Sequence, residues 1–381
     1  MTYCYRKLLF FLSLNLMFVG RGVLASPLSE PIADPLIPEP LVERPLSPLE
    51  MGRIERKAGE LLLSGQVQWL AQMPELAFAD WFRHLRLLQV LPDRLAEIES
   101  LGNIGAIAWE NNRVQDARDI TARLDRIRET EFTADGVLLL PLAEAYQQLR
   151  NSDQAIALYR THVATLDEPY QAEIWRIIAQ LAVDWFDYEQ GVEAYEKIQN
   201  LNALTIPDRE QFAKLYEKLG KKNEAIAVQL QLAPLYREDL NINKLANVYL
   251  AIATNYYQLG QYQNAILFNE SAFILAWEQK QFAAAETALN NLAQVYIAKD
   301  NLDFAIQVYE QLLIVQNTSY NRFGMMETYD HLGKLYQQKP LYPEALISYQ
   351  KGLAIAKELN HNISLFTQSI EALTFNEIPI Q

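Results

Sequence analysis

The sequence contains little cysteine, histidine and glycine. Its one cysteine is Cys4, so the chain beyond it can form no disulfide, thiolate metal site or thiol nucleophile. The four histidines are spread along the chain, and no glycine-rich phosphate loop, H-E-x-x-H or G-x-S-x-G pattern is present. These absences exclude the common sequence signatures of enzymes, and we expect neither catalytic residues nor a required cofactor.

Positive charge is also scarce. The chain has 33 Lys and Arg against 47 Asp and Glu, which gives a formal net charge of -14. Nucleic-acid binding depends on clustered basic residues, so we expect no nucleic-acid partner. An acidic surface is typical of a soluble chain, and it would also attract basic segments or divalent cations.

Residues 1–25 have the layout of a secretory signal peptide. Arg6 and Lys7 precede an apolar run from Leu8 to Gly20, and Val23-Leu24-Ala25 offers a cleavage site. The run is shorter than the roughly 20 residues that span a bilayer. We therefore expect an exported protein of the periplasm, thylakoid lumen or cell envelope. After cleavage it would keep no transmembrane anchor and could associate only peripherally with a membrane complex.

The next segment, residues 26–49, is rich in proline. Proline fixes φ and removes a backbone donor, so this stretch predicts a disordered, extended tether. The alternative is a ligand for the groove of another protein.

The remainder of the chain has an internal period. Five segments place a Tyr three residues after a small residue and an Ala nine residues after that Tyr. The Tyr–Ala pairs are Tyr146–Ala155, Tyr216–Ala225, Tyr256–Ala265, Tyr296–Ala305 and Tyr336–Ala345. Two weaker copies, around Ala117 and Gly191, keep the phase. Sustained self-similarity of this kind predicts stacked helical hairpins.

This pattern resembles the tetratricopeptide-repeat (TPR) family, which implies an all-α superhelical solenoid of about 7–8 repeats. The small residues let two helix backbones approach closely, and the Tyr fills the gap beside them. The last units repeat every 40 residues, so their helices should be longer, as in the branch that includes kinesin light chains. The expected organisation is a signal peptide (1–25), a Pro-rich linker (26–49), a helical cap or degenerate repeat (50–97), the repeat array (98–360) and a closing helix with tail (361–381).

The resemblance also implies where a partner would bind. Family members hold other proteins in a groove lined by the first helix of each repeat. Carried over to this sequence, the expected partner-binding residues are Asn247, Thr254, Tyr257, Asn290, Asn291, Gln294, Asp330, His331 and Lys334. Asn291 matches the asparagine that holds a peptide backbone in the longer-repeat branch, although it could equally be an ordinary exposed polar residue.

One group of residues suggests a metal site. Glu327, Asp330 and His331 are spaced i, i+3 and i+4, which puts them on one side of a helix. Two carboxylates and an imidazole suit Mn²⁺ or another divalent ion. The competing interpretation is a solvated polar face in which Lys334 pairs with Asp330.

These observations leave three functional hypotheses. The first is a non-enzymatic scaffold or assembly factor that holds a client segment. The exported architecture resembles, more weakly, the cyanobacterial processing-associated TPR protein of photosystem II assembly. The second is a protein that delivers a divalent metal such as manganese. The third is a subunit for cell-envelope or outer-membrane biogenesis or secretion.

Overall fold

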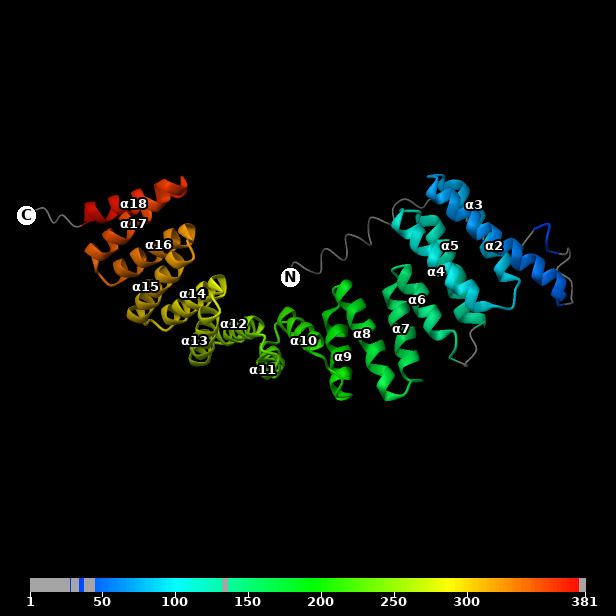
Figure 1. Cartoon of the computed structure of the whole chain (residues 1–381), viewed down its shortest axis with the longest axis horizontal. Coiled ribbons are helices and arrows are strands. Elements are labelled where there is room, and N and C mark those ends of the chain that lie inside the picture. Colours follow the sequence, from blue (N-terminus) through cyan, green and yellow to red (C-terminus); the bar gives the residue numbers. More distant parts are fainter. Residues whose placement is uncertain (1–27, 29–33, 38–44, 132–135, 377–381) are drawn as a thin grey trace, which may run out of the picture. The chain divides into compact units, whose positions relative to one another are not determined.

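The computed structural model describes residues 28, 34–37, 45–131 and 136–376, and it divides into two compact units, Met1–Leu181 and Ala182–Gln381. Every regular element within the described residues is a helix (Figure 1). The predicted all-α fold is therefore confirmed. The predicted signal peptide lies outside the described residues. Within the described ranges, no helix combines the length and apolar character needed to span a bilayer.

The first unit is a series of helices joined by short turns. They are α2 (Pro48–Leu70), α3 (Pro74–Gln89), α4 (Arg94–Glu110), α5 (Val114–Arg126) with the π-helical turn Ile127–Glu131, α6 (Leu139–Gln148), α7 (Ser152–Val163) and α8 (Glu168–Asp184), whose last residues belong to the second unit. The hairpin of α2 and α3 occupies the region where a cap or degenerate repeat was expected.

The second unit contains the longer hairpins. Its helices are α9 (Tyr188–Asn200), α10 (Ile206–Lys218), α11 (Lys222–Glu238), α12 (Ile242–Gln258), α13 (Tyr262–Glu278), α14 (Phe282–Ala298), α15 (Leu302–Thr318), α16 (Arg322–Gln338), α17 (Tyr342–Leu359) and α18 (Ile363–Asn376). Helices α12 to α16 have 17 residues each, so both helices of a 40-residue hairpin are long. In the shorter repeats α4 and α8 also have 17 residues, but their partners α5 and α9 have 13, and α6 and α7 have 10 and 12. The lengthening predicted from the 40-residue period is confirmed.

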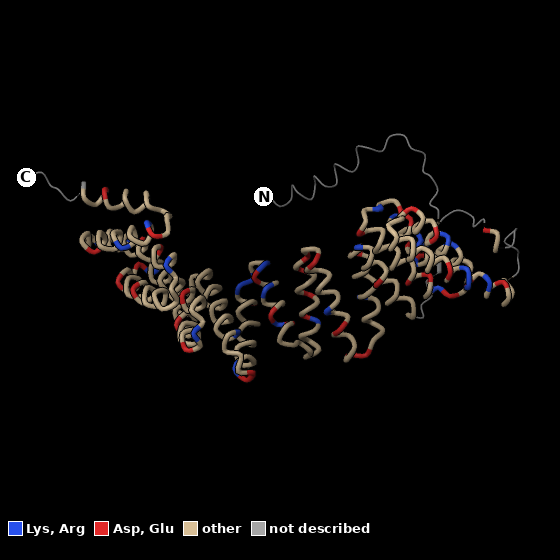
Figure 2. The backbone as a smooth tube through the Cα atoms, turned by 45° about the horizontal axis from the view of Figure 1, so that its top comes forward, with Lys and Arg blue, Asp and Glu red and all other residues tan. Residues whose placement is uncertain are grey.

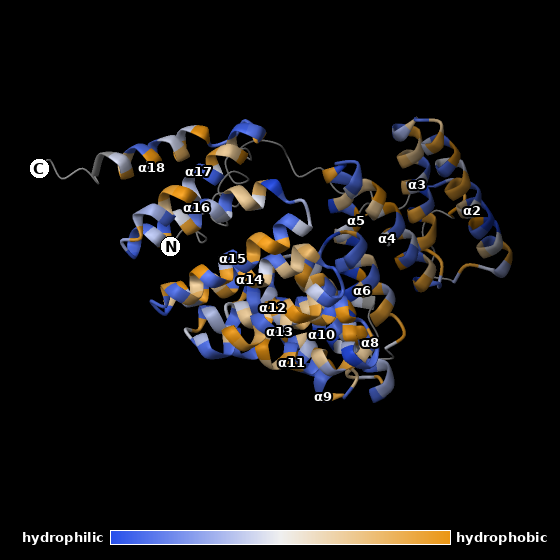
Figure 3. Ribbon diagram, turned by 60° about the vertical axis from the view of Figure 1, so that its left-hand side comes forward, coloured by the Kyte–Doolittle hydropathy of each residue, from blue (hydrophilic) through white to orange (hydrophobic). Residues whose placement is uncertain are grey.

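The small residues of the repeat pattern lie where two helices meet. Ala225, Ala265, Ala305 and Ala345, on the second helices, are fully buried. On the first helices, the equivalent Ala253, Ala293 and Gly333 are also buried. In Figure 3 the helices carry both apolar and polar stretches, as expected when one face of each is packed against its neighbours.

The turns within and between hairpins use one residue in the left-handed region. Gly220 (φ 73°) and Gly260 (φ 71°) end their first helices in this way. Glycine adopts this conformation without steric cost. Lys280, Asp300 and Tyr320 occupy the same place in later turns, with φ between 55° and 57°.

The repeat Tyr of the first helix has a second role that the sequence pattern did not reveal. In three of the five repeats with this Tyr, its hydroxyl donates to a carboxylate on the preceding second helix. Tyr216 donates to Glu196 Oε1 at 3.1 Å and Tyr336 to Glu310 Oε1 at 3.0 Å. Burial and the nearby Glu310 carboxylate raise the pKa of Tyr336 to about 12, so the hydroxyl keeps its proton and the bond at neutral pH.

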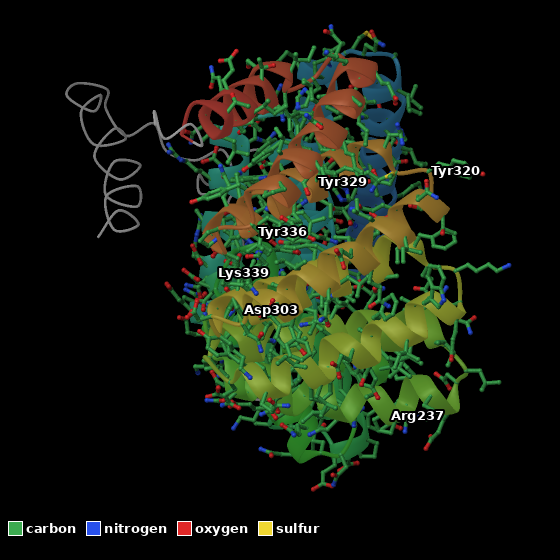
Figure 4. All side chains as sticks on the ribbon, turned by 90° about the vertical axis from the view of Figure 1, so that its left-hand side faces the viewer. Arg237, Asp303, Tyr320, Tyr329, Tyr336 and Lys339 are labelled. Atoms are coloured by element: carbon green, nitrogen blue, oxygen red, sulfur yellow. The ribbon has the colours of Figure 1, made fainter. Side chains whose placement is uncertain are left out.

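Ion pairs add to these contacts between neighbouring hairpins. Lys339, just beyond α16, pairs with Asp303 at the start of α15, and both are labelled beside Tyr336 in Figure 4. The side chains of Lys339 and Asp303 are 26% and 72% exposed, and exposed pairs of this kind contribute at most about 1 kcal/mol. This ion pair therefore adds little to the packing between the hairpins.

The prediction of an extended tether over residues 26–49 is wrong where the structure describes that segment. Residues 34–37 form a turn on the hairpin of α2 and α3. Ile37 is buried among apolar side chains of that hairpin, and Asp34 Oδ2 accepts a hydrogen bond from Arg83 Nε at 2.8 Å. An apolar residue and a charge with a matching partner stabilise this docking, which proline content alone does not predict.

Candidate functional site

A polar pocket of about 290 Å³ lies between two consecutive first helices, α14 and α16, with α15 behind them. We call it the α14–α16 pocket. Its lining residues are Glu286, Thr287 and Asn290 from α14, Leu312 and Gln316 from α15, and Asn321, Phe323, Gly324, Glu327, Thr328 and His331 from α16 and its N-cap. Asn290 and His331 are among the expected partner-binding residues, and Glu327 and His331 belong to the predicted metal group.

One wall of the pocket is a carboxylate held in a fixed position. Glu286 Oε1 accepts a hydrogen bond from Ser319 Oγ at 2.7 Å, and Glu286 Oε2 accepts one from Asn321 Nδ2 at 2.6 Å. Asn321 is itself anchored, because its Oδ1 caps the start of α16 by accepting from the Gly324 N–H at 2.9 Å. The turn before α16 thus orients a side chain of α14.

The back of the pocket is a buried amide. Gln316 is 4% exposed, and its Oε1 accepts from Thr328 Oγ1 at 2.9 Å. Its Nε2 has no hydrogen-bond acceptor among the described residues. A Cβ at Gly324 would lie 2.7 Å from this nitrogen and 2.6 Å from Asn321 Nδ2. An added Cβ would therefore displace these two amides from their positions in the pocket.

The imidazole of His331 forms part of the opposite side. It stacks on the ring of Tyr309, with ring centroids 5.2 Å apart and an interplanar angle of 9°. Burial lowers the pKa of His331, against the opposing effect of the Asp330 carboxylate. The ring is therefore neutral at pH 7. Gln294 Nε2 donates to the Tyr309 hydroxyl at 2.7 Å, which fixes the ring that supports the imidazole.

Negative charge dominates around the pocket. Helices α13, α14 and α15 contain no Lys or Arg (Figure 2). No Lys or Arg lines the pocket. Among the described residues, neither Glu286 nor Glu327 has a Lys or Arg partner within ion-pair distance. The pocket therefore presents two carboxylates without a compensating cation.

The structure does not assemble the predicted metal triad. Asp330 Oδ2 pairs with Lys334 Nζ at 2.6 Å, and Asp330 does not line the pocket that Glu327 and His331 share. In the part of the chain that the structure describes, no three His, Cys, Asp or Glu side chains are grouped to hold a metal ion. The reason is geometric: Asp330 is turned about 100° from His331 around the helix, towards the Lys334 side.

The other predicted partner-binding residues lie outside the pocket. Asn247 and Thr254 are exposed on α12, and Thr254 Oγ1 donates to the Leu250 carbonyl at 2.9 Å. Tyr257 is exposed and contacts the ring of Tyr262. Asn291 is half-buried beside Asn290 on α14. Gln294 and Lys334 are engaged with Tyr309 and Asp330, as described above.

Sequence reasoning missed Glu286, Gln316, Asn321 and Thr328. The family's groove positions lie on first helices, so Gln316 on α15 was never considered. Only Asn321 had a recognisable signal, since an Asn directly before a helix is a common N-cap.

Comparisons with known proteins agree with this architecture. Sequence models described as tetratricopeptide repeat match residues 284–358 and residues 138–171. No curated protein matches the chain. Among solved structures, the MamA protein is 20% identical, with 50% of this chain and 94% of that chain covered and a TM-score of 0.39.

Two other solved structures show the same level of similarity. YrrB, described as a TPR protein with an unusual peptide-binding site, is 16% identical, covering 51% of this chain and 91% of that chain with a TM-score of 0.36. The C-terminal part of a TPR repeat-containing protein from Cytophaga hutchinsonii is 13% identical, covering 67% and 95% with a TM-score of 0.41. Together with the phased hairpins, the sequence matches show that this all-helical chain carries tetratricopeptide repeats.

Proposed function

We propose that the chain is a non-enzymatic scaffold that holds an extended segment of another protein against the first helices of its last repeats. The supporting observation is the α14–α16 pocket, which opens between two first helices and offers unused hydrogen-bonding groups. Asn290 is exposed there and makes no side-chain hydrogen bond within the described residues. Its amide can supply a donor and an acceptor to a peptide backbone.

The setting of this function is part of the proposal. The sequence of residues 1–25 supports export to a periplasm or lumen, where the client would be a subunit or precursor awaiting assembly. The weaker resemblance to the cyanobacterial processing-associated TPR protein makes photosystem II assembly the more specific hypothesis. An envelope or secretion complex is the alternative client.

The test uses a photo-crosslinking amino acid at position 290 of the full chain in its native host. A crosslinker at position 223, exposed on the second helix α11, is the comparison. We expect a discrete protein adduct from position 290 only. The captured partner is then purified, and its affinity is measured by biolayer interferometry.

Asn290→Ala combined with Asn291→Ala should weaken partner binding without lowering thermal stability. The matched control is Asn223→Ala with Asn264→Ala, which removes two amides from second helices. Equal adducts from both crosslinker positions, or unchanged affinity after the α14 substitutions, would remove the groove from consideration.

A further inference from the structure

We infer that the α14–α16 pocket binds the side chain of an arginine or lysine in the extended client segment. This inference rests on the proposed function and assigns the residue class that anchors the client. Glu286 and Glu327 stand at the pocket without a cation, in a region of the unit whose three helices α13 to α15 lack basic residues. A volume of about 290 Å³ is near the lower limit for small-molecule pockets, and it suits a single long side chain.

Glu286 is prepared to receive a cation. Ser319 and Asn321 each occupy one of its oxygens at 2.7 and 2.6 Å. A carboxylate has about four acceptor sites, so each oxygen can accept one more hydrogen bond. Because the existing donors fix the carboxylate, a guanidinium would meet an acceptor that loses little conformational freedom on binding.

The buried amide of Gln316 points to a peptide and not to a bare cation. Gln316 is only 4% exposed, and its Nε2 is a donor without an acceptor among the described residues. Gln316 lines the pocket, so a ligand carbonyl entering it could accept a hydrogen bond from this nitrogen. A ligand that carries both a cation and a carbonyl is what an extended peptide with a basic residue provides.

The remaining lining residues do not oppose a cation. The imidazole of His331 is neutral at pH 7 and presents a flat ring fixed on Tyr309. Helix α16 carries one Arg and one Lys, and both are paired: Arg322 Nη2 lies 2.6 Å from Glu358 Oε2, and Lys334 Nζ lies 2.6 Å from Asp330 Oδ2. Arginine should bind more tightly than lysine, because its planar fork can donate two parallel hydrogen bonds to one carboxylate.

The test measures peptide binding to the full chain by fluorescence anisotropy. The probes are four labelled nonapeptide pools with Arg, Lys, Gln or Glu at the central position and uncharged randomised flanks. We expect the Arg pool to bind at least tenfold more tightly than the Gln pool, the Lys pool to fall between them, and the Glu pool to bind most weakly. Glu286→Gln with Glu327→Gln should reduce the Arg preference to threefold or less.

Two further variants make the result specific. Glu327→Gln alone changes an exposed side chain without an ion-pair partner, so it tests the idea even if the change at Glu286 disturbs folding. Glu238→Gln with Glu278→Gln removes the same charge from exposed positions on the second helices α11 and α13, and should keep the full preference.

The possible results separate a failure of the cation assignment from a failure of the groove function. Equal binding of all four pools, with weaker binding after Asn290→Ala and Asn291→Ala, would overturn the cation assignment and leave the groove function intact. If the control pair lost the Arg preference equally, the preference would come from the overall negative charge of the chain and not from the pocket. That result would also overturn the assignment. Absence of binding by every pool would count against both the pocket assignment and the groove.

Discussion

Gly333→Ala should destabilise the last repeat, because glycine at this position permits a close contact between α16 and Tyr349 of α17. A Cβ at Gly333 would lie 2.5 Å from Tyr349 Cε1 and 2.6 Å from Cζ, whereas ordinary contact begins at 3.4 Å. Tyr349 is 1% exposed, so its ring has no solvent to move into. Moving it would press on Phe366 of the closing helix, whose ring lies 6.4 Å away in an edge arrangement.

Three effects set the magnitude. Overpacking a filled core costs about 1–3 kcal/mol. Displacing the ring also weakens the hydrogen bond from the Tyr349 hydroxyl to Gln337 Oε1, 2.9 Å long, which is worth about 1 kcal/mol. Replacing glycine by alanine within a helix returns about 1 kcal/mol. The expected net loss in the free energy of unfolding is therefore about 1–3 kcal/mol.

Urea unfolding followed by circular dichroism at 222 nm measures this loss. Gly59→Ala is the matched control, since Gly59 is an exposed helical glycine with open space around the added Cβ, and it should gain about 0.5–1 kcal/mol. In a Tyr349→Ala background the cost of Gly333→Ala should vanish. A Gly333→Ala chain at least as stable as the parent would refute the close approach.

Three other substitutions test the first unit and the turns. Arg123→Met should cost about 3 kcal/mol in urea unfolding, because it removes a partner at 2.6 Å from the fully buried carboxylate of Glu97; a loss below about 1 kcal/mol would contradict this. Burial works to raise the pKa of Asp34, but hydrogen bonds, chiefly from Arg83, outweigh it and hold the pKa below 3.8. The stability difference between the parent and Asp34→Asn should therefore be present above pH 3.8 and disappear as the pH falls further, and a difference that persists at lower pH would be inconsistent with this linkage. Gly260→Ala should cost about 1–2 kcal/mol in thermal unfolding, because φ is 71° and alanine is strained there. No atom lies within 4 Å of the added Cβ, so this cost comes from the backbone alone.

The sequence predicted the hairpins well because their packing repeats at a fixed spacing. A small residue such as Ala265 or Ala305 is needed wherever two helix backbones approach, so the requirement recurs in phase and is visible in one sequence. The turns were visible for the same reason, at Gly220 and Gly260. A later turn has Asp300 in this place. Aspartate tolerates the left-handed region, but it is too common elsewhere to identify a turn from the sequence.

The pocket could not be predicted in the same way, since it depends on how consecutive hairpins are placed against each other. Glu286 and Asn321 are 35 residues apart, and their contact exists only when α14 and α16 adopt one particular register. The metal triad failed for a related reason. Asp330 and His331 are adjacent on the helix, but Asp330 pairs with Lys334 whereas His331 lines the pocket. Helical spacing alone does not predict these different partners.

In some irregular repeats a hydrogen bond between two positions is retained although the residues at those positions change. In the last repeat the Tyr349 hydroxyl donates to Gln337 Oε1 at 2.9 Å. Three 40-residue periods earlier the same two positions hold Gln229 and Glu217, and Gln229 Nε2 donates to Glu217 Oε1 at 2.7 Å. The smaller Gln leaves room that Asn255 fills, with its Nδ2 at 3.1 Å from both partners. A sequence pattern that requires Tyr at this position does not recognise Gln229. The hydrogen bond is nevertheless retained, and Asn255 also bonds to both residues. The bond is not retained in every repeat: one period later the two positions hold Asn269 and Tyr257, and the buried Asn269 donates from Nδ2 to the Ala265 carbonyl of its own helix at 2.9 Å.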